Sequence, residues 1–216
     1  GDNLYTNTAL ALDVATGNVK WERDERWPNA SHSKLRAGES ARERLTRMQS
    51  LAQKAPGNAE GAIAVARSNP RTIYVGTGAG IIRPDLAIGN GVYKSTDAGQ
   101  RWQHLGLRDT QMIAAIAVDP TNADRLFVAA LGHPYGPNDE RGVFRSTDGG
   151  TSFQKVLYKD EYTSANEALL DPKNPNTVYA TLWSQQQSFI EGQGFGNAGM
   201  GIFKSTDGGS TWTQLQ

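Results

Sequence analysis

Acidic side chains occur in three segments rich in glycine and proline, where they could carry out acid–base chemistry. Asp85 lies in the first segment, Asp139 and Glu140 lie in the second, and Glu191 lies in the third. Hydrolysis of a glycosidic bond needs two carboxyl groups roughly 5 to 9.5 Å apart, one as the acid and one as the base or nucleophile. The four side chains could converge on such a site, or each could be a solvated loop charge. The sequence leaves both interpretations open.

His133 is the side chain best suited to proton transfer. It lies beside Tyr135 and near Asp139 in the second of these segments, so it could act as a general base or adjoin a bound sugar. The alternative is a histidine that only orders its own loop by hydrogen bonding. His32 and His104 are remote in sequence, and a chain without cysteine offers no thiolate ligand. We therefore predict no transition-metal site and no cofactor.

The composition excludes several classes of function. The 216 residues include 22 Lys+Arg and 22 Asp+Glu, which gives a formal net charge of zero. A neutral chain lacks the positive field that nucleic-acid binding requires, so no nucleic-acid partner is predicted. The absence of cysteine excludes a disulfide scaffold and thiolate catalysis. The longest apolar runs, such as 112–118, are too short to span a bilayer.

Three copies of one sequence pattern occupy residues 61–216. Each copy alternates short β-branched or aromatic runs with turns rich in Gly, Pro and Asn, which is typical of four short strands. Four strands that recur about every 40 to 50 residues have the spacing of propeller blades. The sequence therefore predicts an all-β fold, a partial β-propeller with three four-stranded blades at about 61–105, 113–158 and 165–216.

Residues 1–60 do not resemble a fourth copy. Residues 1–21 alternate apolar and polar side chains around Thr16-Gly17-Asn18, which predicts a β-hairpin. Residues 22–60 read as a charged linker that contains one short helix at about 40–54, where Ser40 and Glu43 form a capping box. Because closed propellers take about four to eight blades, the remaining propeller blades or another chain are expected to cover the open sheet edges.

Each copy contains the pattern S-T-D-x-G-x-x-aromatic. An aspartate at the start of a tight turn can accept hydrogen bonds from backbone N–H groups, glycine permits a positive φ, and the aromatic ring packs beneath the turn. One active site does not need the same carboxylate in every blade, so we predict a structural role. The residues concerned are Ser95, Asp97, Gly99 and Trp102; Ser146, Asp148, Gly150 and Phe153; and Ser205, Asp207, Gly209 and Trp212.

These motifs resemble the Asp boxes of the BNR-repeat proteins, a superfamily that includes sialidases, the sortilin (VPS10) ectodomain and xyloglucan-cleaving glycosidases. The resemblance is greatest to bacterial sortilin-like proteins often labelled glycosyl hydrolases, through the segments 74–78, 91–97, 129–133 and 136–143. The resemblance implies that each box joins the third and fourth strands at the periphery of a blade. It also implies that the loops between the second and third strands lie at the opposite, ligand-facing end.

Those loops are 79–90, 131–141 and 183–200, and they contain the candidate ligand-binding residues. Variable loops on a constant scaffold are typical of recognition surfaces, although exposed loops also lengthen without function. Aromatic rings can stack on sugars or on peptide side chains, and charged groups can bind polar atoms. The candidates are Arg83, His133, Tyr135, Asp139, Arg141, Trp183 and Glu191.

The N-terminal hairpin resembles a different family. Residues 11–21 fit A-x-D-x-x-T-G-x-x-x-W, which is similar to the tryptophan-docking motif that fastens blades together in quinoprotein dehydrogenases. The docked Trp21 is structural in that family, so the motif implies a propeller and not a bound quinone.

The function expected from the sequence is a non-catalytic β-propeller segment that binds a protein or a glycan ligand. Two alternatives stay open. The chain could be part of a sialidase-like or xyloglucanase-like glycoside hydrolase whose active site is completed by other blades, or a fragment of a quinoprotein dehydrogenase. By family resemblance, the protein is expected to be extracellular or periplasmic.

Overall fold

The computed structural model describes residues 61–80, 88–184 and 199–215, and these residues form twelve β-strands. The hairpin expected at 1–21 and the helix expected at 40–54 lie outside the described residues, as do the loop segments 81–87 and 185–198. The described part of the chain contains no helix.

The strands form three antiparallel sheets of four, each with its strands in sequence order. We call these sheets blade 1, blade 2 and blade 3. Blade 1 contains β1 (Ala62–Val65), β2 (Ile73–Gly76), β3 (Val92–Ser95) and β4 (Gln103–Gly106). Blade 2 contains β5 (Ile113–Val118), β6 (Leu126–Ala130), β7 (Gly142–Ser146) and β8 (Gln154–Leu157). Blade 3 contains β9 (Thr163–Leu170), β10 (Val178–Ser184), β11 (Gly201–Ser205) and β12 (Thr213–Gln214).

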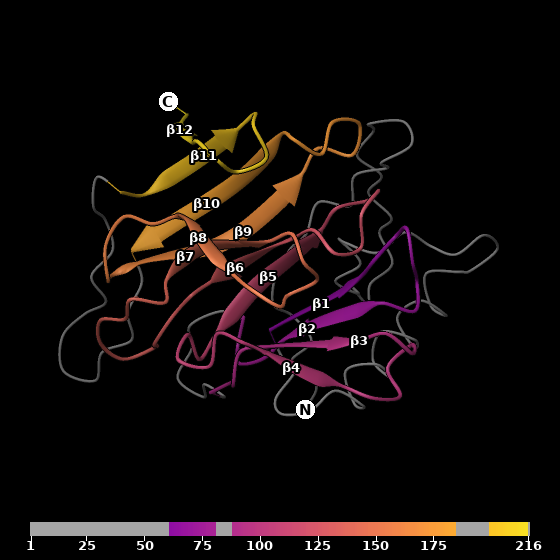
Figure 1. The fold of residues 1–216 in the computed structure, drawn as a ribbon. Helices are drawn as coiled ribbons and strands as arrows, with labels where there is room; N and C mark the ends of the chain where they lie inside the picture. Colours follow the sequence, from indigo (N-terminus) through magenta and orange to yellow (C-terminus); the bar gives the residue numbers. More distant parts are fainter. Residues whose placement is uncertain (1–60, 81–87, 185–198, 216) are drawn as a thin grey trace, which may run out of the picture.

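The three blades lie against one another like the sectors of a fan (Figure 1). The first strand of each blade is innermost: β5 contacts both β1 and β9. The last strands, β4 and β12, lie at the outside (Figure 1). This arrangement confirms the all-β, partial-propeller fold expected from the repeats.

The cores lie between the blades, and the middle sheet, blade 2, is buried on both faces. Tyr74 and Val92 of blade 1 belong to the same buried cluster as Ile116 and Phe144 of blade 2. On its other face, blade 2 contributes Phe127 and Val143, among others, to a second cluster shared with β9, β10 and β11 of blade 3. A strand buried on both sides reads as a continuous apolar run, which is the pattern of β5 and β6.

The three Asp boxes form the same turn between the third and fourth strands. In blade 2 the Ser146 hydroxyl donates to Asp148 Oδ1 at 2.8 Å and accepts from the Gly150 N–H at 2.8 Å. Asp148 Oδ1 also accepts from the backbone N–H of Ser152 at 3.0 Å. Ser95 with Asp97, and Ser205 with Asp207, make the matching bonds. The two side chains of each box thus satisfy backbone donors that the turn leaves without a strand partner.

Removal of the Ser146 hydroxyl tests the contribution of one box. We expect Ser146→Ala to lower the free energy of unfolding by about 1 to 3 kcal/mol, because the buried N–H of Gly150 loses its acceptor. Urea denaturation followed by fluorescence measures the change. Thr147→Ala is the matched control: this neighbouring side chain is exposed, and its removal should change stability by less than about 0.5 kcal/mol. Equal effects of the two variants would contradict a supporting role for the box.

Candidate functional site

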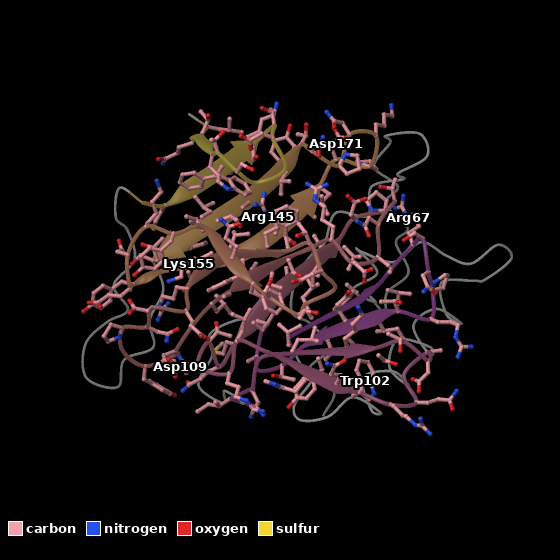
Figure 2. All side chains as sticks on the ribbon, in the orientation of Figure 1. Arg67, Trp102, Asp109, Arg145, Lys155 and Asp171 are labelled. Carbon is pink, nitrogen blue, oxygen red and sulfur yellow. The ribbon has the colours of Figure 1, made fainter. Side chains whose placement is uncertain are left out.

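Three connections meet at the end of the blades opposite the Asp boxes: 107–112, 131–141 and 158–162. The Asn138 amide donates to Asp109 Oδ2 at 3.1 Å, and its backbone N–H donates to the carbonyl of Glu161 at 3.0 Å. The Thr110 hydroxyl donates to the carbonyl of Glu140 at 2.7 Å. Figure 2 shows Asp109 at the left of the molecule, far from the strand turns that carry Arg67 and Asp171 at the right. The loops therefore form one surface that joins blades 1, 2 and 3.

Arg141 holds the 131–141 loop in its shape from inside. The side chain is fully buried, and its guanidinium donates to the carbonyls of Leu131 at 2.8 Å, His133 at 2.6 Å and Gly136 at 3.1 Å. It also donates to the hydroxyl of Ser164, which belongs to β9. Five donors in a planar fork suit a loop whose carbonyls point inward.

Two features of the site follow from this burial. Burial lowers the pKa of Arg141 to about 10, while the charge of Asp160 opposes the shift, so the guanidinium stays protonated at neutral pH. Gly132 lies beside the guanidinium stem with φ at 80°, and a Cβ there would collide with Arg141. The sequence expectation placed Arg141 on the ligand-binding surface, whereas the structure places it beneath that surface.

His133 pairs with a different aspartate from the one that the sequence suggested. Its Nε2 lies 3.2 Å from Asp109 Oδ1, and the His133 side chain retains a quarter of its accessible surface. Because Asn138 binds the other carboxylate oxygen of Asp109, the carboxylate is fixed against the imidazole. A histidine oriented by an aspartate can accept or donate a proton at its second ring nitrogen.

Asp139 belongs to a neighbouring cluster on blade 2. Its carboxylate accepts from the Tyr158 hydroxyl at 3.4 Å, and its carbonyl accepts from the Lys155 ammonium. The ammonium also lies 4.2 Å from the centroid of the Tyr158 ring. Burial, followed by the charge of Asp139, raises the pKa of the Tyr158 hydroxyl, so at neutral pH the phenol is a donor. Figure 2 shows Lys155 on the same side of the molecule as Asp109.

The remaining candidates are only partly placed by the structure. Tyr135 lies on the 131–141 loop and is 40% exposed, and Trp183 near the end of β10 is 46% exposed. Arg83, Asp85 and Glu191 lie outside the described residues. Convergence of the four loop carboxylates therefore stays a prediction.

Two polar residues were missed by sequence reasoning. Asp109 lies in the connection between blades 1 and 2 and contacts the loop only because the blades pack together. Asn166 lies at a β-bulge in β9, where blade 2 has Ala114, and its amide oxygen is buried without a hydrogen-bond partner in the described structure. Comparison of the repeats would have revealed Asn166, because an amide replaces a methyl group on the innermost strand.

Within the ranges 61–80, 88–184 and 199–215, no group of three or more His, Asp or Glu side chains could hold a metal ion. No helix in these same ranges is long and apolar enough to cross a membrane.

The fold and the three boxes define this chain as an Asp-box β-propeller segment. The model of the Sortilin-Vps10 family, described as sortilin, neurotensin receptor 3, matches residues 90–216, which is more than half of the chain. The chain therefore belongs to the Sortilin-Vps10 family.

One curated relative is named as an enzyme. A probable oligoxyloglucan-reducing end-specific xyloglucanase from Neosartorya fischeri is 34% identical over 100 residues, which cover 44% of this chain and 12% of that protein. The crystal structure of an ancestral GH74 enzyme superposes with a TM-score of 0.53 at 24% identity, covering 74% of this chain and 18% of the other. This structural likeness supports the propeller fold. The chain spans a small part of the length of both proteins.

Proposed function

We propose that this chain is a carbohydrate-binding segment of a β-propeller and that the 131–141 loop carries the recognition surface. The observation that supports the proposal most directly is the exposed ring of Tyr135 on a loop that the buried Arg141 holds in place. A rigid aromatic ring can stack on a sugar with little loss of conformational entropy. The polar groups of His133 and Asp109 lie on the same surface and can bind hydroxyl groups.

The ligand class comes from the relatives. The curated relative from Neosartorya fischeri is named as acting on oligoxyloglucan, so oligosaccharides of xyloglucan are the first ligands to test. An extracellular or periplasmic location would be consistent with such a ligand. A peptide ligand is the competing outcome, because the same aromatic and charged groups can bind peptide side chains.

Isothermal titration calorimetry with xyloglucan oligosaccharides tests the proposal. We expect wild type to bind and Tyr135→Ala to bind about tenfold more weakly, because the stacked ring is lost. Leu169→Ala is the control: Leu169 is 39% exposed but lies near the other end of blade 3, where β9 leads into the turn at Asp171. Equal loss in both variants, or the absence of binding to the wild-type chain, would exclude this placement of the site.

A glycoside hydrolase is the second candidate, and the oriented His133–Asp109 pair together with the enzyme relative favours it. A reducing-sugar assay on the same oligosaccharides separates the two functions. Release of new reducing ends that is abolished by Asp109→Asn would establish hydrolysis, whereas binding without release would leave the chain as a binding segment.

A further inference from the structure

A basic side chain just before each Asp box lies at the boundary with the next blade. In blade 1, Lys94 Nζ donates to the carbonyl of Gly149 at 3.2 Å, within the Asp box of blade 2. In blade 2, Arg145 Nη1 donates to the carbonyl of Gly208 at 2.7 Å, within the Asp box of blade 3. Two successive interfaces therefore use the same contact, in which a cation binds the carbonyl that follows the box aspartate. We call this contact the latch.

Blade 3 carries the donor half of a third latch. Lys204 pairs with Tyr179 across β10 and β11, in the register of Lys94 with Tyr74 and of Arg145 with Phe127. Its Nζ lies 5.5 Å from the centroid of the Tyr179 ring, as Lys94 Nζ lies 5.4 Å from that of Tyr74. Lys204 therefore occupies the position in blade 3 that Lys94 and Arg145 occupy in blades 1 and 2.

The apolar side chains around Lys204 are exposed where their equivalents are buried. Ile202 is 51% exposed, whereas the equivalent Val143 of blade 2 is completely buried and belongs to the cluster shared with blade 3. Leu169 is 39% exposed, and its equivalent Ala117 is 6% exposed. An apolar sheet face of this kind marks an interaction surface. We call the face formed by Leu169, Tyr179, Ile202 and Lys204 the outer face of blade 3.

We propose that the outer face of blade 3 docks a further Asp-box blade of the same polypeptide, and that Lys204 latches onto the carbonyl of the residue after that blade's box aspartate. Both existing latches join blades that follow one another in one polypeptide. The basic donor that recurs in all three blades and the exposed apolar side chains of the outer face together specify a partner that carries an Asp-box turn.

A second copy of this chain fits the outer face poorly. The blade that it would have to offer is blade 1, whose outward-facing side chains are already buried: Ile73 is 2% exposed and Val75 is completely buried. Blade 1 also has Ala98 where the other boxes have Gly149 and Gly208. Gly149 and Gly208 have φ of 71° and 72°, a conformation that glycine adopts most readily, and a Cβ at Gly149 would approach Nζ of Lys94. We infer that the docked blade carries Asp-Gly at this turn.

Photo-crosslinking in the full polypeptide that contains these residues tests the assignment. A photoreactive amino acid in place of Lys94 is the positive control and should capture the turn around Gly149. The same amino acid in place of Lys204 should capture a peptide with an Asp-Gly turn from the same polypeptide. Capture of a second copy, or no capture while the control succeeds, would overturn the proposal.

Thermal unfolding supplies a second readout. Lys204→Ala should lower Tm in the full polypeptide by about as much as Lys94→Ala does. It should leave Tm of the 216-residue chain unchanged, since the described residues offer Lys204 no box carbonyl. Lys204→Arg should retain the wild-type Tm, because arginine serves the latch at position 145. An equal loss of Tm in the full polypeptide and in the 216-residue chain would contradict the proposal, because Lys204 would then stabilise only blade 3 itself.

Discussion

Replacement of Arg141 by methionine should destabilise the protein by about 3 to 5 kcal/mol, because the carbonyls of His133 and Gly136 lose their donor and the Leu131 carbonyl keeps only the Ser164 hydroxyl. Methionine has a similar length and fills most of the space, so the loss reports the hydrogen bonds more than a cavity. The carbonyls of Leu131, His133 and Gly136 are the groups left without the guanidinium. Urea denaturation followed by circular dichroism measures the free energy of unfolding.

The control for this variant is Arg108→Met at the same end of the blades. Arg108 is exposed and donates only to Asn90 Oδ1, at 3.3 Å, among the bonds identified in the described residues. Its loss should change stability by less than about 0.5 kcal/mol. A loss below about 1 kcal/mol for Arg141→Met would show that the loop keeps its shape without the guanidinium. In that case, the rigidity assumed for Tyr135 in carbohydrate binding would need another cause.

The sequence was sufficient to predict the blades because their determinants are local and repeated. Ser146, Asp148 and Gly150 recur in each copy, and the bonds that they make span two to four residues. Turn chemistry of this kind depends on side chains close in sequence. Blade 3 was expected to begin at about 165, and its first strand, β9, begins at Thr163.

The candidate site was less accessible to sequence reasoning because its contacts cross between blades. The partner of His133 is Asp109, 24 residues away in the chain, and blade packing alone brings the two together. Arg141 was expected on the surface since arginine is almost never fully buried without partners. Its partners here are three backbone carbonyls and the Ser164 hydroxyl of the next blade, and backbone carbonyls carry no signature in the sequence. The sequence therefore could not predict that the 131–141 loop folds around the guanidinium of Arg141.

Acid is expected to unfold the protein through its Asp boxes. The Ser152 hydroxyl and its backbone N–H, followed by the Ser146 hydroxyl, lower the pKa of Asp148 from 3.8 to about 2. The backbone N–H of Arg101 is the main cause that lowers the pKa of Asp97. The Thr211 hydroxyl is the main cause for Asp207, whose pKa is also well below its ordinary value. All three carboxylates are charged acceptors in the folded state.

The sign of the pH dependence follows from these shifts. Below about pH 4 the unfolded chain takes up protons at its aspartates while the folded boxes do not, so the free energy of unfolding falls as pH falls toward about 2. Above about pH 5 the carboxylates are ionised in both states, and their contribution is constant.

Urea titrations at half-unit intervals from pH 6 to about pH 2 should show a plateau followed by a steep decline. Asp148→Asn keeps an oxygen acceptor without a titrating group, so it should make the decline shallower, and the double variant with Asp207→Asn shallower still. A decline that is as steep in the double variant as in wild type would place the acid-sensitive groups outside the boxes.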